Sequence, residues 1–331
     1  MPLCIIIDSM KGFAILSDYS NYMLAVKGRS PLTVKNYCFD ISTFFRYIKE
    51  QRGLCKSWMS FKDISLSDVD AEFLNSVSTE DILAYLVWLN RSKQLSGTTR
   101  ARRIASLRSF FTYCEQKRHF IDHNPTINIE TPKIGDRNPK YLTLEESKHL
   151  LDVAYESPNE FNARNYCMLV LFLNCGMRLS ELRGINLEMI KGNVLTVIGK
   201  GNKERTVYLN KSCLDALDEW YIARNKIKIN EKDKNALFVS KLGNRISDDA
   251  IQYAIKRLLT SAGLDTTKYS VHKLRHTAAT LMYKYGNVDI RSLQSILGHK
   301  SVSTTQIYTH VDEEQLRRAV ASNPLAEYDP D

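Results

Sequence analysis

The chain has 331 residues, of which 44% are hydrophobic and 25% charged, with a formal net charge of +9 and an isoelectric point of about 9.1. This length predicts two domains, and the composition is that of a soluble globular protein. The basic surplus favours nucleic acid as a partner over a membrane surface, although the charge alone fits a mildly basic soluble protein equally well.

The cysteines and the apolar stretches exclude several other classes of protein. Seven cysteines are scattered without a Cys-x-x-Cys pair, so neither disulfides nor a zinc knuckle is expected. The apolar run at residues 3–7 lacks a basic leader and is too short for a signal peptide. No stretch approaches the length of a membrane span. We therefore expect a cytoplasmic protein without membrane contacts.

The first part of the chain has the apolar spacing of helices. Such spacing runs through residues 12–27, and Ser30 and Pro31 then supply an N-cap and a first-turn proline for a second helix. Residues 52–78 mix polar and apolar positions, which predicts a loop with a short helix. A third helix is expected over residues 79–89.

A basic helix is predicted to begin at Ser96 and Gly97. Ile104 and Leu107 lie on one side of it, and arginines with small hydroxyl residues lie on another. Residues 91–118 contain eight Lys or Arg and one acid. Such side chains can donate to a phosphate backbone, so DNA contact is predicted, with a solvated basic face as the alternative. The residues assigned to DNA are Thr98, Thr99, Arg100, Arg102, Arg103, Ser106 and Arg108.

A linker is predicted at residues 123–140, where three prolines and one glycine interrupt the helical pattern. Thr143 and Glu146 then form a capping-box pattern that opens the next helix. The expected parts are an extension at 1–11, a helical bundle at 12–122, a larger domain at 141–311 and a terminal segment at 312–331.

The larger domain is predicted to contain a strongly apolar core helix at residues 163–175. Gly176 ends this helix, and Arg178 follows with Glu181 three residues later. An arginine beside a buried helix is costly to desolvate unless it meets an anion or an acid. A local ion pair with Glu181 and an anion site both satisfy this requirement.

The clearest β signal is a hairpin formed by residues 194–198 and 205–209. Lys200 lies between two glycines in the connecting turn, and by itself would be a solvated turn residue. The spacing of a P-loop is absent and no helix follows, so nucleotide binding is not expected. Further helices are predicted at residues 211–229 and 247–262.

Four of the seven histidines lie between His272 and His310. On a helix, His272, Arg275 and His276 share one face. The zinc-protease pattern requires a glutamate where Lys273 stands, and Arg275 would repel a divalent cation, so no metal is expected. An arginine with an imidazole suits a phosphate. His276 has a plainer alternative as a structural histidine that bonds the backbone.

Tyr308 raises the prospect of a covalent intermediate. A phenol with an ordinary pKa of about 10 is a weak nucleophile at neutral pH. It requires a clamped electrophile, neutralisation of the developing charge and a proton acceptor, which two arginines and a histidine can supply. Tyr308 is one of 17 tyrosines, and on its own a packing role is the better interpretation.

In this order the motifs resemble those of the tyrosine recombinase/integrase family, of the simple two-domain Xer-like type. The segments that carry the resemblance are residues 100–103, 107–111, 175–182, 199–201, 272–276, 297–299 and 307–310. The resemblance implies a mainly α fold with a small β-hairpin or sheet. It further implies a SAM-like, core-binding helical bundle followed by a mixed α+β catalytic domain of the DNA breaking-rejoining type.

The resemblance also implies a role for each residue on the phosphate side of the site. Arg178 and Arg275 would clamp the non-bridging oxygens of the scissile phosphate. Lys200 would protonate the departing 5′ oxygen. Glu181 would support the arginines.

The same resemblance assigns the nucleophile and the proton carriers. Tyr308 would attack and form a 3′-phosphotyrosyl link, and His272 would act as acid and base toward its proton. His299 would hydrogen-bond the phosphate, while His276 would have a supporting role. The link conserves energy, so no ATP, metal or other cofactor is expected.

The partners implied are duplex DNA with an inverted-repeat site and further recombinase subunits. Strands would be exchanged through a Holliday junction within a homotetramer, or within a tetramer that includes a second related recombinase. The helix expected at 312–321 resembles the segment that docks on a neighbouring subunit. Three alternatives remain at this stage: a type IB-like topoisomerase, a catalytically silent DNA-binding regulator of the same fold, and a metal hydrolase built on His272 and His276.

Overall fold

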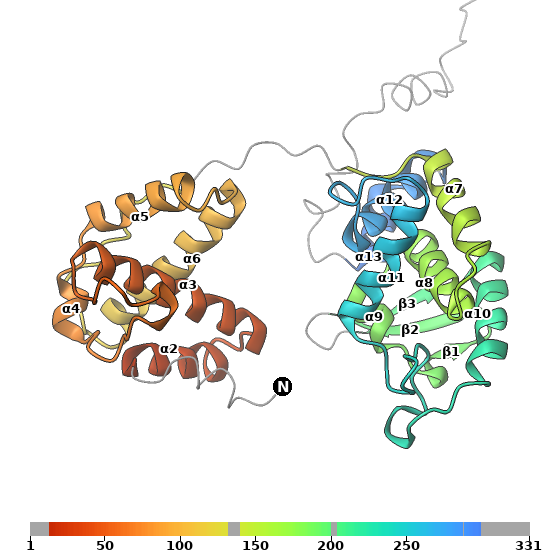
Figure 1. The fold of residues 1–331 in the computed structure, drawn as a ribbon, viewed down its shortest axis with the longest axis horizontal. Coiled ribbons are helices and arrows are strands. Elements are labelled where there is room, and N and C mark those ends of the chain that lie inside the picture. Colours follow the sequence, from red (N-terminus) through yellow and green to blue (C-terminus); the bar gives the residue numbers. More distant parts are fainter. Residues whose placement is uncertain (1–12, 132–139, 200–203, 287, 299–331) are drawn as a thin grey trace, which may run out of the picture. The chain divides into compact units, whose positions relative to one another are not determined.

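A computed structural model describes residues 13–131, 140–199, 204–286 and 288–298 (Figure 1). The chain forms two compact units, Met1–Asp136 and Arg137–Asp331. Both are mainly helical, and a small sheet lies in the second, as the sequence predicted. Within the described ranges, no helix is long and apolar enough to cross a membrane.

The N-terminal unit is a helical bundle. Its elements are α2 (Ala14–Ala25), α3 (Pro31–Gln51), the 3-10 helix η1 (Phe61–Asp63), α4 (Ala71–Asn75), α5 (Thr79–Arg91) and α6 (Gly97–Gln116). Ser30 caps α3, with its hydroxyl accepting from the backbone N–H of Thr33 at 3.3 Å, and Pro31 is the first helical residue, as predicted. The loop with a short helix predicted at residues 52–78 is also confirmed, as η1 and α4.

Aromatic rings fill the core of this bundle, where α3 packs against α6. Phe44 and Phe45 of α3 and Phe110 and Phe111 of α6 are all fully buried. Across the two helices, Phe45 meets Phe110 and Phe44 meets Phe111 edge-to-face, with ring centroids 5.9 Å and 6.2 Å apart. Edge-to-face pairs stabilise a core beyond the area that they bury, so these rings set how the two long helices meet.

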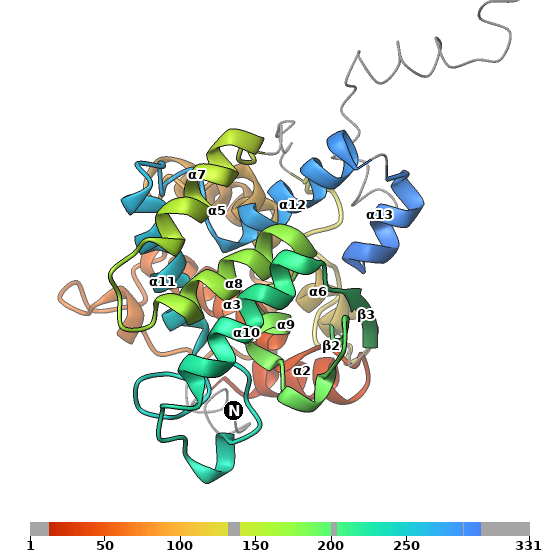
Figure 2. The same cartoon turned by 90° about the vertical axis from the view of Figure 1, so that its right-hand side faces the viewer.

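The C-terminal unit surrounds one central helix. Its helices are α7 (Leu144–Tyr155), α8 (Asn162–Cys175), α9 (Leu179–Gly184), α10 (Lys211–Arg224), α11 (Asp248–Ser261), α12 (Val271–Tyr285) and α13 (Ile290–Leu297), with 3-10 helices η2 (Leu187–Met189) and η3 (Glu231–Asp233). Helix α8 packs against α7, α10, α11 and α12 (Figure 2). It is buried from Cys167 to Leu173, so the predicted core helix is confirmed. The predicted capping box of α7 is present as well.

The sheet is antiparallel in the order β1 (Ile190–Lys191), β2 (Val194–Ile198) and β3 (Glu204–Tyr208). Strands β2 and β3 form the predicted hairpin, with Ile198 opposite Glu204. One prediction was wrong, because the helix expected over 211–229 ends at Arg224. The Arg224 guanidinium donates to the carbonyls of Lys234 and Ala236, which holds the returning chain across the helix end.

Candidate active site

The centre of the candidate site is a buried carboxylate that faces three arginines. The Glu181 side chain is fully buried. Nη1 of Arg178 donates to its Oε1 at 2.6 Å, and Nη2 of Arg205 donates to its Oε2 at 2.8 Å. Nη1 of Arg275 lies 3.9 Å from the same Oε2. The carboxylate therefore gathers the two arginines that were assigned to the phosphate, together with a third.

The charge of Glu181 is maintained in spite of its burial. Burial raises the pKa of the carboxyl group, but the hydrogen bonds and charges of Arg205 and Arg178 outweigh it and hold the pKa below the ordinary value of 4.5. The group is therefore ionised at neutral pH. Three guanidinium groups around one carboxylate leave a surplus of positive charge, which suits a phosphate ligand.

The chain around Gly176 brings these groups together. Gly176 ends α8 in the left-handed conformation at φ 57°, and its carbonyl accepts from Nη1 of Arg275 at 2.6 Å. Arg178 then stands at the N-cap of α9, where its backbone N–H donates to Oε2 of Glu181 at 2.9 Å. A Cβ at residue 176 would lie 2.8 Å from Cδ2 of Leu297, so the position requires glycine for both its φ and its packing.

The same three arginines hold the C-terminal end of α13. Each of the carbonyl groups at this end accepts a hydrogen bond from a different arginine. The Ile296 carbonyl accepts from Arg205, the Leu297 carbonyl from Arg275 and the Gly298 carbonyl from Arg178. Cations at a helix C-terminus satisfy its free carbonyl groups and complement its dipole. In the sequence His299 follows directly, and His299, Lys200 and Tyr308 all lie outside the described residues.

His272 and His276 lie on α12 beside Arg275, with their rings perpendicular and their centroids 5.4 Å apart. Burial, followed by the charges of Arg275, Lys273 and Arg178, lowers the pKa of His272 below its ordinary value. Burial, followed by neighbouring positive charges, lowers the pKa of His276 to about 4. Both imidazoles are therefore neutral at pH 7, and a neutral ring can accept a proton.

Arg205 was not among the residues selected from the sequence. It shares the inward face of β3 with Val207, while Glu204, Thr206 and Tyr208 are exposed. Alternation along a strand therefore puts one charged residue on a buried face. That position was a signal in the sequence that Arg205 needs an acid or carbonyl partner inside the fold.

The residues assigned to DNA contact divide into inward and outward sets on α6. Asp40 of α3 is fully buried and forms an ion pair with Arg102. Ser106 is also fully buried, with its hydroxyl 3.3 Å from Oδ2 of Asp40. Arg103 is nearly buried and donates to the Tyr85 hydroxyl at 2.8 Å. Ser106 and Arg103 thus face the bundle interior, because α3 packs against that side of α6.

The outward set includes Thr98 and Arg102, whose side chain is 43% exposed despite its ion pair. Thr99 and Arg100 are partly exposed in the first turn of the helix. Arg108 donates to the carbonyl of Ile129 at 2.7 Å, which fastens the chain after the bundle to α6. The exposed basic surface is therefore narrower than the helical pattern suggested.

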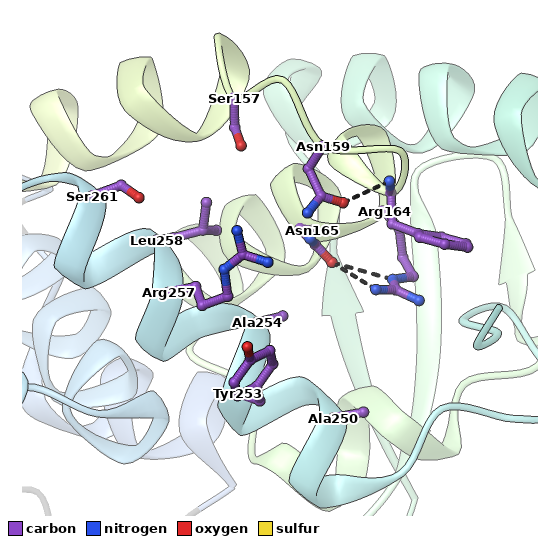
Figure 3. A pocket seen from close by; sticks show the side chains of 11 residues that line it. Ser157, Asn159, Arg164, Asn165, Ala250, Tyr253, Ala254, Arg257, Leu258 and Ser261 are labelled. Atoms are coloured by element: carbon purple, nitrogen blue, oxygen red, sulfur yellow. Dashed lines mark hydrogen bonds between the residues drawn. The ribbon is translucent and has the colours of Figure 1, made fainter.

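A separate polar pocket of about 210 Å³ lies between α8, α11 and the turn after α7 (Figure 3). Arg257 extends into it from α11, and Asn165 faces it from α8. The buried Arg164 guanidinium donates to Asn165 Oδ1 and to the carbonyl of Val239, and burial lowers its pKa to about 10. The lining includes none of the residues assigned to phosphate or proton chemistry. Throughout the described ranges, including this pocket, no group of three or more His, Cys, Asp or Glu is placed to hold a metal ion.

Comparison with known families gives the class of this protein. Residues 15–119 match the model of the phage integrase N-terminal SAM-like domain, and residues 140–315 match that of the phage integrase family. The chain therefore belongs to the phage integrase family, the tyrosine recombinases.

The chain is also similar to named relatives along most of its length. It is 51% identical to Tyrosine recombinase XerC of Caldanaerobacter subterraneus subsp. tengcongensis, over 97% of this chain and 89% of that one. It is 34% identical to Tyrosine recombinase XerC of Alcanivorax borkumensis, over 83% and 90% of the two chains. These similarities confirm the predicted class of enzyme, a tyrosine site-specific recombinase.

The fold matches solved structures of the same class. One is XerH site-specific recombinase bound to palindromic difH substrate in a post-cleavage complex, with a TM-score of 0.69 and 23% identity over 93% of this chain and 84% of that one. At this identity the match concerns the fold, and it confirms the predicted helical bundle followed by a mixed α+β domain.

Proposed function

We propose that this recombinase cleaves and rejoins duplex DNA at a specific site through a covalent bond between Tyr308 and a 3′ phosphate. The observation that carries the proposal is the pairing of Arg178 and Arg275 at one buried carboxylate, with His272 beside them on α12. These groups come from separate segments, and together they supply positive charge and a proton acceptor. A phosphate undergoing attack by a phenol requires both.

The arginines hold the reacting phosphate in this mechanism. Arg178 and Arg275 donate to its two non-bridging oxygens and neutralise the charge that builds up as phosphorus becomes five-coordinate. Glu181 keeps the two guanidinium groups close without entering the reaction itself. Removal of one such charged donor from a pre-organised site typically slows a reaction by about 100-fold to 1,000-fold.

The bond changes balance without an external cofactor. The Tyr308 oxygen attacks phosphorus while the bond to the 5′ oxygen breaks, and His272 accepts the phenol proton. Lys200 donates a proton to the departing 5′ oxygen, and His299 hydrogen-bonds the phosphate. His276 supports its neighbours on α12. When a 5′ hydroxyl from a partner strand attacks the phosphotyrosine, the same steps run in reverse and release Tyr308.

We further propose how the parts of the chain divide this work. Residues 12–122 bind DNA through the outward side of α6, and residues 141–311 carry out cleavage. Residues 312–331 contact a neighbouring subunit in a tetramer on an inverted-repeat site, where strands exchange through a Holliday junction. A second related recombinase could occupy half of that tetramer. A relative of similar fold was solved bound to its palindromic difH substrate, which supports a DNA partner.

The test of the nucleophile uses Tyr308→Phe in the full-length chain. A duplex selected by the wild-type protein from a library of inverted repeats, nicked within the spacer, traps a covalent adduct if cleavage occurs. The variant should bind this duplex and form no adduct. Tyr285→Phe is the matched control, because Tyr285 is 64% exposed and lies at the end of α12. Adduct formation by Tyr308→Phe would refute the assignment.

Two further readouts of the same assay separate the alternatives. Cleavage should persist in EDTA; loss of cleavage that zinc restores would favour a metal hydrolase. The wild-type protein should exchange strands between two duplexes that carry the selected site. Relaxation of supercoiled plasmid without strand exchange would instead indicate a type IB-like topoisomerase.

A further inference from the structure

Arg205 links three segments of the candidate active site. It lies on β3 opposite Val197 of β2, in the hairpin whose turn contains Lys200 in the sequence. Its Nη2 donates to Oε2 of Glu181 on α9 at 2.8 Å, and its Nη1 donates to the carbonyl of Ile296 on α13. Its side chain is only 11% exposed. One guanidinium thus connects the hairpin, the central carboxylate and the end of α13.

The backbone at Gly298 leaves room for this side chain. A Cβ at residue 298 would lie 2.8 Å from Cδ of Arg205 and 3.4 Å from its Nε. Gly298 also has a φ of 63°, which favours glycine. A side chain at residue 298 would therefore displace the stem of Arg205, and glycine allows the arginine to pass close to the backbone at the end of α13.

Its contacts distinguish Arg205 from Arg178, the more exposed of the two arginines assigned to the phosphate. Both of its terminal nitrogens donate within the protein, and its Nε is buried near Gly298 without a hydrogen-bond partner in the described part of the chain. Arg178 is 31% exposed and so can reach a ligand. Arg205 is therefore suited to act through its neighbours rather than on the phosphate itself.

From these contacts we infer that Arg205 is a positioning residue, which orients Glu181 and the end of α13 so that Arg178 and Arg275 face the scissile phosphate. The inference rests on the proposed function. Burial raises the pKa of Glu181, and the hydrogen bond and the charge of Arg205 are the largest effects that lower it. Without Arg205, the carboxylate would turn fully onto the two other arginines and compete with the phosphate for their N–H groups.

A rival role for Arg205 is to position the hairpin, and hence the lysine that protonates the leaving group. Chemically altered DNA separates the two roles. A methylphosphonate at the scissile position replaces a charged oxygen with methyl, so less charge has to be neutralised by arginine. A bridging sulfur at the 5′ position leaves readily as a thiolate, so no acid is required.

The experiment compares full-length Arg205→Met and Arg205→Lys with the wild type. Arg245→Met is the matched control, because Arg245 is partly buried and donates to the carbonyls of Arg183 and Ile185 and to Oδ1 of Asn186, rather than to Glu181 or the end of α13. Binding and single-turnover cleavage are measured on the selected duplex. We expect Arg205→Met to bind within about threefold of wild type but to cleave about 100-fold more slowly, in the range for loss of one pre-organised charged donor. Arg205→Lys should be intermediate and Arg245→Met unaffected.

The altered substrates then test the route by which Arg205 acts. On the methylphosphonate duplex, the deficit of Arg205→Met relative to wild type should shrink to below about 10-fold, because the misplaced arginines have less charge to neutralise. The 5′-sulfur duplex should leave the deficit unchanged. A merely structural defect would slow cleavage of all three substrates alike.

Three results would overturn the inference: wild-type cleavage by Arg205→Met, an equal deficit on the methylphosphonate, or rescue by the 5′ sulfur. If circular dichroism shows that Arg205→Met does not fold, the same comparison is made with Arg205→Lys. The same three results, obtained with Arg205→Lys, would then overturn the inference. Adduct formation by the wild type through Tyr308 is scored separately. Its absence would refute the proposed function, whereas its presence with an unaffected Arg205→Met would refute this inference alone.

Discussion

Substitution of Glu181 by glutamine should destabilise the C-terminal unit by about 3–5 kcal/mol. The carboxylate accepts three hydrogen bonds, from the backbone N–H and Nη1 of Arg178 and from Nη2 of Arg205. An amide with its oxygen at the Oε2 position keeps two of these bonds with a neutral acceptor and loses the bond from Nη1 of Arg178, which costs roughly 1.5–3 kcal/mol. The lost charge adds to this cost, because breaking a buried ion pair by removing one partner costs about 3–5 kcal/mol. Because Arg178 is 31% exposed and water screens its charge, we expect the loss of stability to lie near the lower limit of the range of about 3–5 kcal/mol.

The assay is urea unfolding of the full-length chain, followed by the fluorescence of Trp220. Trp220 is 1% exposed and is the one tryptophan of the C-terminal unit, so Trp58→Phe and Trp88→Phe in the background isolate its signal. Glu204→Gln is the matched control, because it removes the same charge from an exposed position on β3. A change below about 1 kcal/mol for Glu181→Gln would refute the idea that this carboxylate balances the arginines.

The pH dependence provides a further check on the same variant. The pKa of Glu181 in the folded protein lies below its ordinary value of 4.5. Its contribution to stability is therefore present above that ordinary value and is lost as the pH falls through the folded pKa. The difference between wild type and Glu181→Gln should shrink in acid. A difference that stays constant down to acid unfolding would contradict the charge-based explanation.

Two further predictions concern other buried groups. Asp40→Asn should destabilise the N-terminal unit by about 1–3 kcal/mol in urea unfolding, because it removes the charged partner of Arg102, while burial, which raises the pKa of the Asp40 carboxyl group, limits what its charge contributes; an unchanged midpoint would contradict this. The pKa of His276 is about 4 in the folded protein against an ordinary 6.5. As the pH falls, His276 therefore takes up a proton in the unfolded chain before it does so in the folded protein. The wild type should lose thermal stability between pH 6.5 and 4, and His276→Gln should lose less. Parallel pH profiles would refute that reasoning.

The residues of the proposed phosphate chemistry were selected from short segments of the sequence. Arg178 with Glu181, and His272 with Arg275, each lie within one turn of helix, so spacing alone puts their side chains on a common face. The ion pair that this spacing allowed between Arg178 and Glu181 is present. What spacing could not reveal is that Arg275 lies beside the same carboxylate as Arg178, because that depends on how α8 and α12 pack.

The basic helix shows the limit of a helical pattern. The pattern put Arg102, Arg103 and Ser106 on one polar side of α6. In the fold, α3 brings a buried aspartate to this side, and Ser106 and Arg103 turn inward to meet it. A polar face predicts solvent only when no neighbouring element supplies a partner charge, and the partner Asp40 lies far away in the sequence.

The sequence by itself determined the helices, their caps and the hairpin, and it supplied the groups to which we assign the proposed cleavage. These features depend on neighbours along the chain, such as Ser30 before Pro31 or Gly176 at the end of α8. Only the tertiary structure decided that Arg205 joins Glu181 and that three arginines hold the end of α13. The physical reason is that a buried charge acquires its meaning from the partners that packing brings to it, and packing joins residues that the sequence keeps apart.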